Sequence, residues 1–255
     1  MPKVIISGCN GRMGQVMTRM LGERNIEIVA GFDIKMTGFS AYPVYDEPMD
    51  YTGEVDVVVD FSSPEALDKL IEFAVAKNIP LVLCTTGYSA EQLETIAAAS
   101  AKIPVFRSGN MSVGINLISK LLTQAAAVLG GNFDVEIVER HHRTKVDAPS
   151  GTAIMLADAV AEGLDYVPEK VFERQSVRRL RGKTEIGISA VRGGTIVGEH
   201  EVIFAGTDEV IEFKHIAYSR EVFANGAVTA LLFMSDIKTP GMYNMNDALE
   251  NMLNG

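Results

Sequence analysis

The chain has little cysteine, no long apolar run and a shortage of basic residues, and each absence excludes a class of protein. Its 255 residues include two cysteines, Cys9 and Cys84, which are too few for a disulfide framework and favour reduced thiols in a cytoplasmic protein. The most apolar stretch, at 227–234, is well short of the roughly 18 residues that a membrane-spanning helix needs. Lys and Arg total 23 against 33 for Asp and Glu, and the net charge is −10. Neither nucleic acid nor an anionic membrane surface is therefore expected as a partner.

Short apolar runs alternate with helical patterns in the first half of the chain. The alternation is typical of a parallel sheet that has helices on both faces, which is an α/β fold. The strands are predicted at 3–7, 27–32, 55–61, 81–84 and 105–106, and the helices at 13–21, 64–77 and 90–102. Ser63 is predicted to cap the second helix, and Ser89 with Gln92 has the spacing of a capping box at the third.

The pattern changes after about residue 115, which predicts a second domain. A helix at 115–129, a strand at 134–140 and a helix at 151–161 are followed by strands at 186–192, 198–205 and 210–217. Turn residues separate the last three strands, so a β meander or a mixed sheet is expected. A final helix is predicted at 220–234, and the basic segment 174–183 is interpreted as a mobile loop near the site.

A glycine-rich turn joins the first predicted strand to the first predicted helix. Gly8, Gly11 and Gly14 permit a tight turn, close approach of a pyrophosphate and close packing of helix on strand. The helix start offers unpaired N–H groups to the phosphates, and Arg12 can add a cation. Asp33, at the end of the second strand, lies where a carboxylate binds the adenine ribose. The alternatives are a glycine turn without a ligand and an aspartate that only caps a turn. We favour a dinucleotide site.

The most concentrated polar segment runs from 139 to 153. His141 and His142 follow an apolar strand, and Lys145 lies just beyond them. The helix that begins near Ser150 offers N–H groups and hydroxyls to a carboxylate or phosphate. Metal ligation is disfavoured because no cysteine or third histidine has ligand spacing, so no metal is expected. A solvated strand end remains the plain alternative, and we favour a catalytic acid next to a substrate-anion site.

Together these residues resemble one family, the dihydrodipicolinate reductases of the diaminopimelate–lysine pathway. The resemblance covers nearly the whole chain, and the string at 141–152 is its most specific motif. Matching motifs also occur at 8–14, 84–87, 110–112 and 240–245. The resemblance implies a Rossmann-type doubly wound parallel sheet at 1–112, completed by 222–255. It implies a mixed α+β domain at 113–221 that binds substrate and forms a homotetramer.

The resemblance also implies the reaction and the residues that carry it. NADH or NADPH would reduce 4-hydroxy-tetrahydrodipicolinate, a small dicarboxylate ring, to tetrahydrodipicolinate. His141 would donate the proton, with Lys145 sharing the acid role or binding substrate. The substrate's carboxylates would be bound by His142, Ser150, Gly151 and Thr152. The cofactor would be bound by Gly8, Asn10, Gly11, Arg12, Met13, Asp33, Lys35, Thr85, Thr86, Gly87, Asn110, Met111 and Ser112.

One feature departs from the family pattern. Many relatives place a basic residue directly beside the acid that ends the second strand, where it holds the 2′-phosphate of NADPH. Here Asp33 is followed by Ile34, and Lys35 comes one position later. We therefore expect NADH to serve at least as well as NADPH. Two other functions were weighed: an aspartate or homoserine dehydrogenase, which would lack the 141–152 string, and a nucleotide-sensing regulator, which would need a DNA-binding helix.

Overall fold

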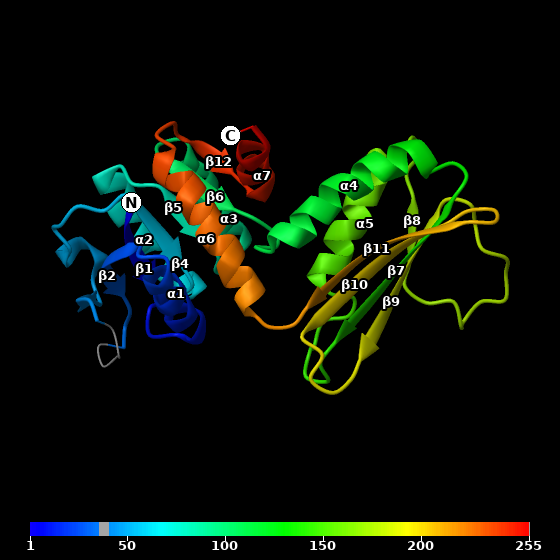
Figure 1. Cartoon of the computed structure of the whole chain (residues 1–255), viewed down its shortest axis with the longest axis horizontal. Helices are drawn as coiled ribbons and strands as arrows, with labels where there is room; N and C mark the ends of the chain where they lie inside the picture. Colours follow the sequence, from blue (N-terminus) through cyan, green and yellow to red (C-terminus); the bar gives the residue numbers. More distant parts are fainter. Residues whose placement is uncertain (36–40, 255) are drawn as a thin grey trace. The chain divides into compact units, whose positions relative to one another are not determined.

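The structure, a computed structural model, describes residues 1–35 and 41–254 and divides the chain into two compact units (Figure 1). The first, here called the N-terminal unit, contains residues 1–113 and 223–255, and the second, the central unit, contains residues 114–222. Both junctions fall one residue later than the predicted domain limits. Within the described ranges no helix combines the length and apolar character needed to cross a membrane.

The N-terminal unit is built on a seven-stranded sheet whose strand pairs are all parallel. Its strands are β1 (Lys3–Ser7), β2 (Glu27–Phe32), β3 (Val44–Tyr45), β4 (Val57–Asp60), β5 (Leu81–Leu83), β6 (Pro104–Arg107) and β12 (Gly241–Tyr243). Their order is β12-β6-β5-β4-β1-β2-β3. This is the Rossmann order extended by one strand, and it confirms the predicted fold class.

Successive residues of a strand point to opposite sides of the sheet. The strands of this sheet are apolar on both sides, and helices cover both faces. Val4 and Ile6 pack in the core cluster that contains α1 (Arg12–Glu23), α6 (Glu221–Asp236) and α7 (Met245–Asn254). Ile5, between them, packs in the cluster that contains α2 (Leu67–Lys77) and α3 (Ala90–Ser100).

The two predicted helix caps had different outcomes. The capping box at Ser89 and Gln92 is present and confirms that prediction. Ser63 instead precedes a short 3-10 helix, η2 (Pro64–Ala66), and its side chain makes no capping bond. A second 3-10 helix, η1 (Pro48–Asp50), follows β3.

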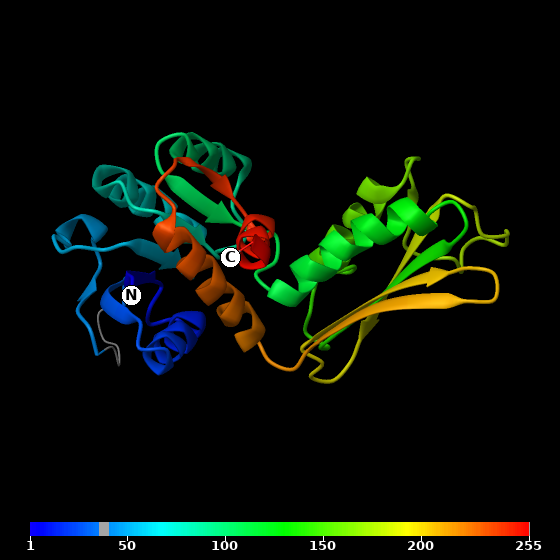
Figure 2. The same ribbon diagram turned by 45° about the horizontal axis from the view of Figure 1, so that its top comes forward.

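The C-terminal segment contains elements that the sequence patterns missed. Strand β12 lies beside β6 and pairs with it in parallel (Figure 2). Helix α7 buries Met245, Ala248 and Leu249. A three-residue strand and a ten-residue helix are marginal in isolation, so packing on the rest of the unit accounts for their stability. Only a tail was predicted here, although Met245, Ala248 and Leu249 have the i, i+3, i+4 spacing of an apolar helix face.

The central unit is a mixed sheet with two helices on one face (Figure 1). Its elements are α4 (Val113–Leu129), β7 (Asp134–His141), α5 (Gly151–Gly163), β8 (Glu169–Val171), β9 (Glu185–Arg192), β10 (Gly198–Ala205) and β11 (Val210–Ala217). The strand order is β11-β10-β7-β9-β8, with β10 antiparallel to both neighbours and β9 parallel to both of its neighbours. The sheet is therefore mixed, and the meander alternative is wrong because β9 pairs with β7 instead of β10.

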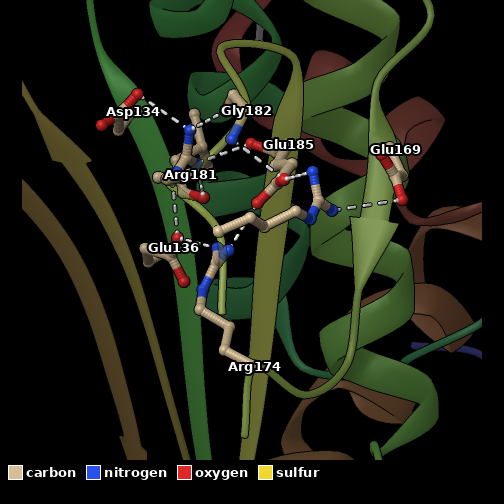
Figure 3. Close-up of polar contacts among 9 residues, drawn as sticks. Asp134, Glu136, Glu169, Arg174, Arg181, Gly182 and Glu185 are labelled. Atoms are coloured by element: carbon tan, nitrogen blue, oxygen red, sulfur yellow. Dashed lines mark hydrogen bonds and ion pairs between the residues drawn. The ribbon is translucent and has the colours of Figure 1, made fainter. Parts of the chain in front are cut away.

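The basic segment 174–183 is tied to the beginnings of β7 and β9 (Figure 3). The Glu185 carboxylate, whose side chain is 1% exposed, pairs with both Arg174 and Arg179. Arg181 bonds to Glu136 and to the backbone of β7 and β9. His141 ends β7, about 20 Å away at roughly 3.3 Å per residue. The prediction of a loop near the site is therefore wrong for this chain.

Candidate active site

The glycine turn lies at the carboxyl end of β1, where the strand order of the sheet reverses. Gly8 has a φ of +75°, and its N–H donates to the carbonyl of Phe32 at 2.8 Å. A Cβ at Gly8 would lie 2.6 Å from the Phe61 carbonyl oxygen, and one at Gly14 would lie 2.2 Å from the Gly8 oxygen. Both positions therefore require glycine, because the turn and the helix pack backbone on backbone.

Helix α1 begins without a side-chain cap, and Gly11 occupies its N-cap position. The partial positive charge and N–H groups at such a helix start favour an anion. A cavity of about 350 Å³ opens at this point. Its lining includes Ser7, Gly8, Gly11, Phe32, Asp33, Ile34, Lys35, Phe61, Ser62 and Lys69. The backbone and the cavity fit a pyrophosphate with an attached nucleoside.

Asp33 links the glycine turn to the end of β2 and also lines the cavity. One carboxylate oxygen accepts the Asn10 N–H and the other accepts the Lys35 N–H, both at 2.9 Å. The Asn10 side chain in turn donates to the Lys35 carbonyl. Each carboxylate oxygen has a second lone pair, so the same group that fixes the turn can also accept a ribose hydroxyl. Both roles considered for Asp33 are thus compatible.

The loops after β4, β5 and β6 emerge at the same carboxyl edge of the sheet. Gly87 adopts a φ of +84°, and the Asn110 side chain accepts the Ser112 N–H at 2.8 Å. Met111 is held under α6, because a Cβ at Gly226 would lie 1.6 Å from its carbonyl oxygen. The sequence analysis missed Asp60, a buried carboxylate at the end of β4 that accepts the Ser62 N–H.

In the central unit, the face of the sheet that carries the core turns polar at one end. Val135 and Ile137 on β7 are buried in the core, and Glu139 and His141 continue the same face. His200 lies opposite Glu139 in the antiparallel pairing of β10 with β7. Three ionisable side chains are therefore brought together by strand register.

Glu139 is at the centre of this polar end, and its side chain is 0% exposed. It accepts hydrogen bonds from His141 Nδ1 at 2.7 Å and from the Ser150 N–H at 2.9 Å. Arg192 reaches both carboxylate oxygens, at 2.7 and 2.8 Å. Burial raises the pKa of Glu139, but the bonds from Arg192, His141 and Ser150 outweigh it and hold the pKa below its ordinary value.

His200 lies between His141 and the start of α5 and contacts both. The His200 Nε2 atom and the Ser150 hydroxyl are 2.9 Å apart, and the same hydroxyl accepts the Ala153 N–H at 3.1 Å. The His141 and His200 rings meet edge to face, with centroids 5.1 Å apart. Burial lowers the pKa of His200 from 6.5 to about 3, and His141 and Lys145 contribute in the same direction. His200 is therefore neutral at physiological pH.

Lys145 and His142 follow β7 in the polar loop before α5. The Lys145 ammonium is 2.8 Å from Asp147 and holds the pKa of that carboxyl below its usual value. His142 turns the other way from His141, and its Nδ1 atom lies 2.8 Å from the Thr144 hydroxyl. Within the part of the chain that the structure describes, no cluster of three or more His, Cys, Asp or Glu side chains is arranged to hold a metal ion.

Comparison with known proteins gives the same family for both units. Residues 2–111 match the description "Dihydrodipicolinate reductase, N-terminus" and residues 114–249 match "Dihydrodipicolinate reductase, C-terminus". The chain belongs to the dihydrodipicolinate reductase family. A 4-hydroxy-tetrahydrodipicolinate reductase of Clostridium perfringens (strain SM101 / Type A) is 48% identical over 252 residues, covering 98% of this chain and 99% of the relative. One of Clostridium tetani (strain Massachusetts / E88) is 50% identical over 254 residues, covering 98% of each chain.

A solved structure supports both the fold and the family. The dipicolinate-bound dihydrodipicolinate reductase of Paenisporosarcina sp. TG-14 is 26% identical, with a TM-score of 0.79, and the match covers 96% of this chain and 99% of that one. The predicted family, fold class and enzyme class are thereby confirmed: the reductase is an oxidoreductase of lysine and diaminopimelate biosynthesis.

Of the predicted site residues, Gly8, Gly11, Asp33 and Lys35 line one cavity in the N-terminal unit, and His141 and Ser150 both bond to Glu139 in the central unit. In the central unit, the residues that the sequence analysis missed are Glu139, Arg192 and His200. Glu139 carried a usable signal, because residues i and i+2 of a strand share a face and His141 was already a candidate. Arg192 and His200 lie 51 and 59 positions after His141, and only strand pairing brings them to it.

Proposed function

We propose that the reductase reduces 4-hydroxy-tetrahydrodipicolinate to tetrahydrodipicolinate with a hydride from NADH or NADPH and a proton from His141. The family's reaction, 4-hydroxy-tetrahydrodipicolinate reduction in lysine biosynthesis, is the activity of this chain. The 4-hydroxyl group and one hydrogen from the neighbouring ring carbon leave together as water, and the conjugated ring that results gains one hydride and one proton. The observation that carries the residue assignment is the buried contact of His141 with Glu139 beside the start of α5.

The N-terminal unit supplies the cofactor site in this proposal. A nicotinamide dinucleotide in its reduced form supplies the hydride when it is bound. Gly8, Gly11 and the start of α1 hold the pyrophosphate, with Arg12 and Met13 in the first turn, and Asp33 holds the adenine ribose. The residues assigned to the nicotinamide are Thr85, Thr86, Gly87, Asn110, Met111 and Ser112.

The central unit supplies the substrate site. The solved relative binds dipicolinate, an aromatic ring with two carboxylates. We propose that a dicarboxylate ring binds here between Lys145 and the start of α5, where a lysine ammonium and helix N–H groups each favour an anion. His142, Gly151 and Thr152 complete the predicted carboxylate contacts. Ser150, also predicted to contact a substrate carboxylate, bonds in addition to Glu139 through its N–H and to Ala153 and His200 through its hydroxyl.

His141 completes the reaction as the general acid. Hydride addition to the conjugated ring leaves an electron-rich carbon, and a C–H bond forms there with the proton that the His141 imidazolium releases. Positive charge from Lys145 stabilises the dianionic ring as negative charge develops on it. The helix start contributes a fixed partial charge in the same direction.

Steady-state kinetics on His141→Gln tests this assignment. The purified chain is given NADH and the freshly condensed product of pyruvate and aspartate semialdehyde, and loss of reduced nicotinamide absorbance is followed. We expect kcat to fall roughly 10²–10⁴-fold with KM and cofactor affinity nearly unchanged, because a general acid acts only as the proton moves. His142→Gln is the comparison variant and should change mainly KM. A kcat within about threefold of the native value for His141→Gln would overturn the assignment and leave Lys145 as the acid.

Assembly and location belong to the same proposal. We propose a cytoplasmic homotetramer, as the sequence resemblance implies. Val191, Val210 and Ile216 are exposed on the face of the mixed sheet opposite α4 and α5, and another copy of the chain would cover them. Cys9 and Cys84 are free thiols, which suits a reducing compartment. Light scattering should give four times the chain mass of 27.6 kDa, and a monomeric mass would contradict the proposal.

A further inference from the structure

The proposed reaction gives no task to the buried carboxylate of Glu139. Glu139 is 0% exposed, and a charged group in such a place is costly unless it is paired and hydrogen-bonded. It lies two residues before His141 on β7, on the same face of the sheet. A structural ion pair with Arg192 alone would not require a histidine on the same carboxylate.

Every partner of the Glu139 carboxylate is a hydrogen-bond donor. Its Oε1 atom accepts the Ser150 N–H and one Arg192 nitrogen, and its Oε2 atom accepts the other Arg192 nitrogen and His141 Nδ1. These bonds hold the pKa of Glu139 below its ordinary value against the effect of burial, so the group is ionised at neutral pH. An ionised carboxylate can only accept, and therefore His141 Nδ1 must carry a hydrogen.

We infer that Glu139 is a positioning residue that fixes the tautomer of His141 and makes Nε2 the atom that delivers the proton. This inference rests on the proposed role of His141 as the general acid. In the imidazolium form both ring nitrogens carry hydrogen. When the substrate carbon takes the proton, the Nε2–H bond breaks and its electron pair stays on nitrogen, which leaves the neutral Nδ1–H form bound to Glu139. Solvent then returns a proton to Nε2 before the next turnover.

The surroundings of Nε2 agree with this assignment. A Cβ added at Gly198, on β10, would lie 3.1 Å from Nε2 and 3.4 Å from the adjacent ring carbon. The absence of a side chain at Gly198 therefore keeps the space at Nε2 open. Glu139, itself held by Arg192, bonds to the opposite edge of the ring, so residues on three neighbouring strands define which edge can react.

Glu139→Gln gives a sharp prediction because an amide has one acceptor and one donor end. Arg192 donates to both oxygen positions, so it does not decide the orientation of the amide. The Ser150 N–H at the Oε1 position can only donate, whereas His141 Nδ1 at the Oε2 position can give up its hydrogen, so the amide oxygen is expected at Oε1. The amide NH2 then faces His141 Nδ1, which must accept. The neutral tautomer inverts to Nε2–H, and the imidazolium loses its partner. We expect kcat to fall about 10²–10³-fold while KM and cofactor affinity stay within about threefold, since a wrong tautomer removes the acid and little else.

The measurement is ¹⁵N NMR of the histidine ring nitrogens in the full-length enzyme at a pH where His141 is neutral. The His141 signals are identified by their loss in His141→Gln. The native enzyme should show the Nδ1–H tautomer and Glu139→Gln the Nε2–H tautomer. Glu201→Gln is the matched control, since Glu201 is on the neighbouring strand, pairs with Arg140 and lies on the opposite face of the sheet from His141. It should leave both the tautomer and kcat unchanged.

Each outcome decides the inference. A native Nε2–H tautomer overturns it directly, even if Glu139→Gln does not fold. An unchanged tautomer in a folded Glu139→Gln, or a kcat within threefold of native, also overturns it. Gly198→Ala leaves Glu139 in place and should lower kcat with the native tautomer retained; a full-rate Gly198→Ala overturns the assignment of Nε2. Failure of the proposed function is separate, because that would show as a fully active His141→Gln whatever the tautomer.

Discussion

The two units of the reductase make their sites from different parts of the polypeptide. The proposed cofactor site of the N-terminal unit is mostly backbone: a turn at Gly8, an uncapped helix start at Gly11, and one carboxylate, Asp33, whose bonds go to N–H groups. The proposed substrate site of the central unit relies on ionisable side chains from three strands, which meet around Glu139. We therefore expect substitutions that add atoms to impair the cofactor site most. Substitutions that remove a charge or a hydrogen-bonding hydrogen should impair the site of the central unit most.

The largest effect is expected where an atom is added to the backbone site. Gly11→Asp should weaken cofactor binding by more than about 100-fold, or roughly 2.7 kcal/mol, because its carboxylate would occupy and repel the pyrophosphate. Fluorescence titration with NADH measures this. Gly22→Asp adds the same charge near the other end of α1, where a Cβ meets nothing within 4 Å, and should leave affinity intact. If both variants bind NADH with the same affinity, then the cofactor does not bind at the glycine turn.

Lys145→Ala tests the site of the central unit by removing a charge. Lys145→Ala should raise the substrate KM about 10–100-fold with a smaller change in kcat, because the ammonium binds a carboxylate in both the ground and transition states. Lys170→Ala, which breaks a surface pair with Asp158 in the same unit, is the control. If kcat falls as far as in His141→Gln and KM does not change, then Lys145 acts in proton transfer.

The preference for NADH or NADPH tests the role of the Asp33 side chain in the proposed cofactor site. Asp33 should repel a 2′-phosphate, and Lys35 offsets part of that repulsion, so NADH should be used at least as well as NADPH. Asp33→Asn should move the kcat/KM ratio about tenfold toward NADPH, or about 1.4 kcal/mol. A native preference for NADPH above about 100-fold would contradict this reading of Asp33.

His200 gives the smallest effect, which is on stability. The folded protein keeps His200 neutral down to about pH 3, whereas the unfolded chain binds a proton near pH 6.5. The unfolded state therefore holds more protons between these values, and the free energy of unfolding decreases as pH falls, by at most about 1.4 kcal/mol per unit from this group. Urea unfolding at pH 7 and pH 5.5 should show a steeper loss for the native chain than for His200→Asn. Parallel losses would contradict the buried neutral histidine.

Local patterns in the sequence were sufficient for most of the fold. Strands β1, β2 and β10 were predicted with their observed bounds because each is a short apolar or alternating run next to turn residues. The short strand β12 was not predicted, because a three-residue strand depends on its pairing with β6. Helix α7 was also missed, although its apolar residues Met245, Ala248 and Leu249 have helical spacing.

The residues of the candidate site also differ in whether local sequence signals could identify them. Gly8, Asp33 and His141 were identified because turn chemistry and residue type are local signals. Arg192 and His200 were not, because their roles depend on the pairing of β9 and β10 with β7. The segment 174–183 was misplaced for the same reason: its charge was visible, but its partners at the strand beginnings were not.

The return of residues 223–255 to the N-terminal unit has a consequence for synthesis. On the ribosome, the central unit emerges complete while the first unit still lacks α6, and Ala227, Ala230 and Leu231 of that helix are 0% exposed in the finished protein. A nascent chain that ends near residue 222 therefore exposes the apolar face formed by Val4 and Ile6. The N-terminal unit is therefore synthesised first but completes its folding last, after its C-terminal helices have left the exit tunnel of the ribosome.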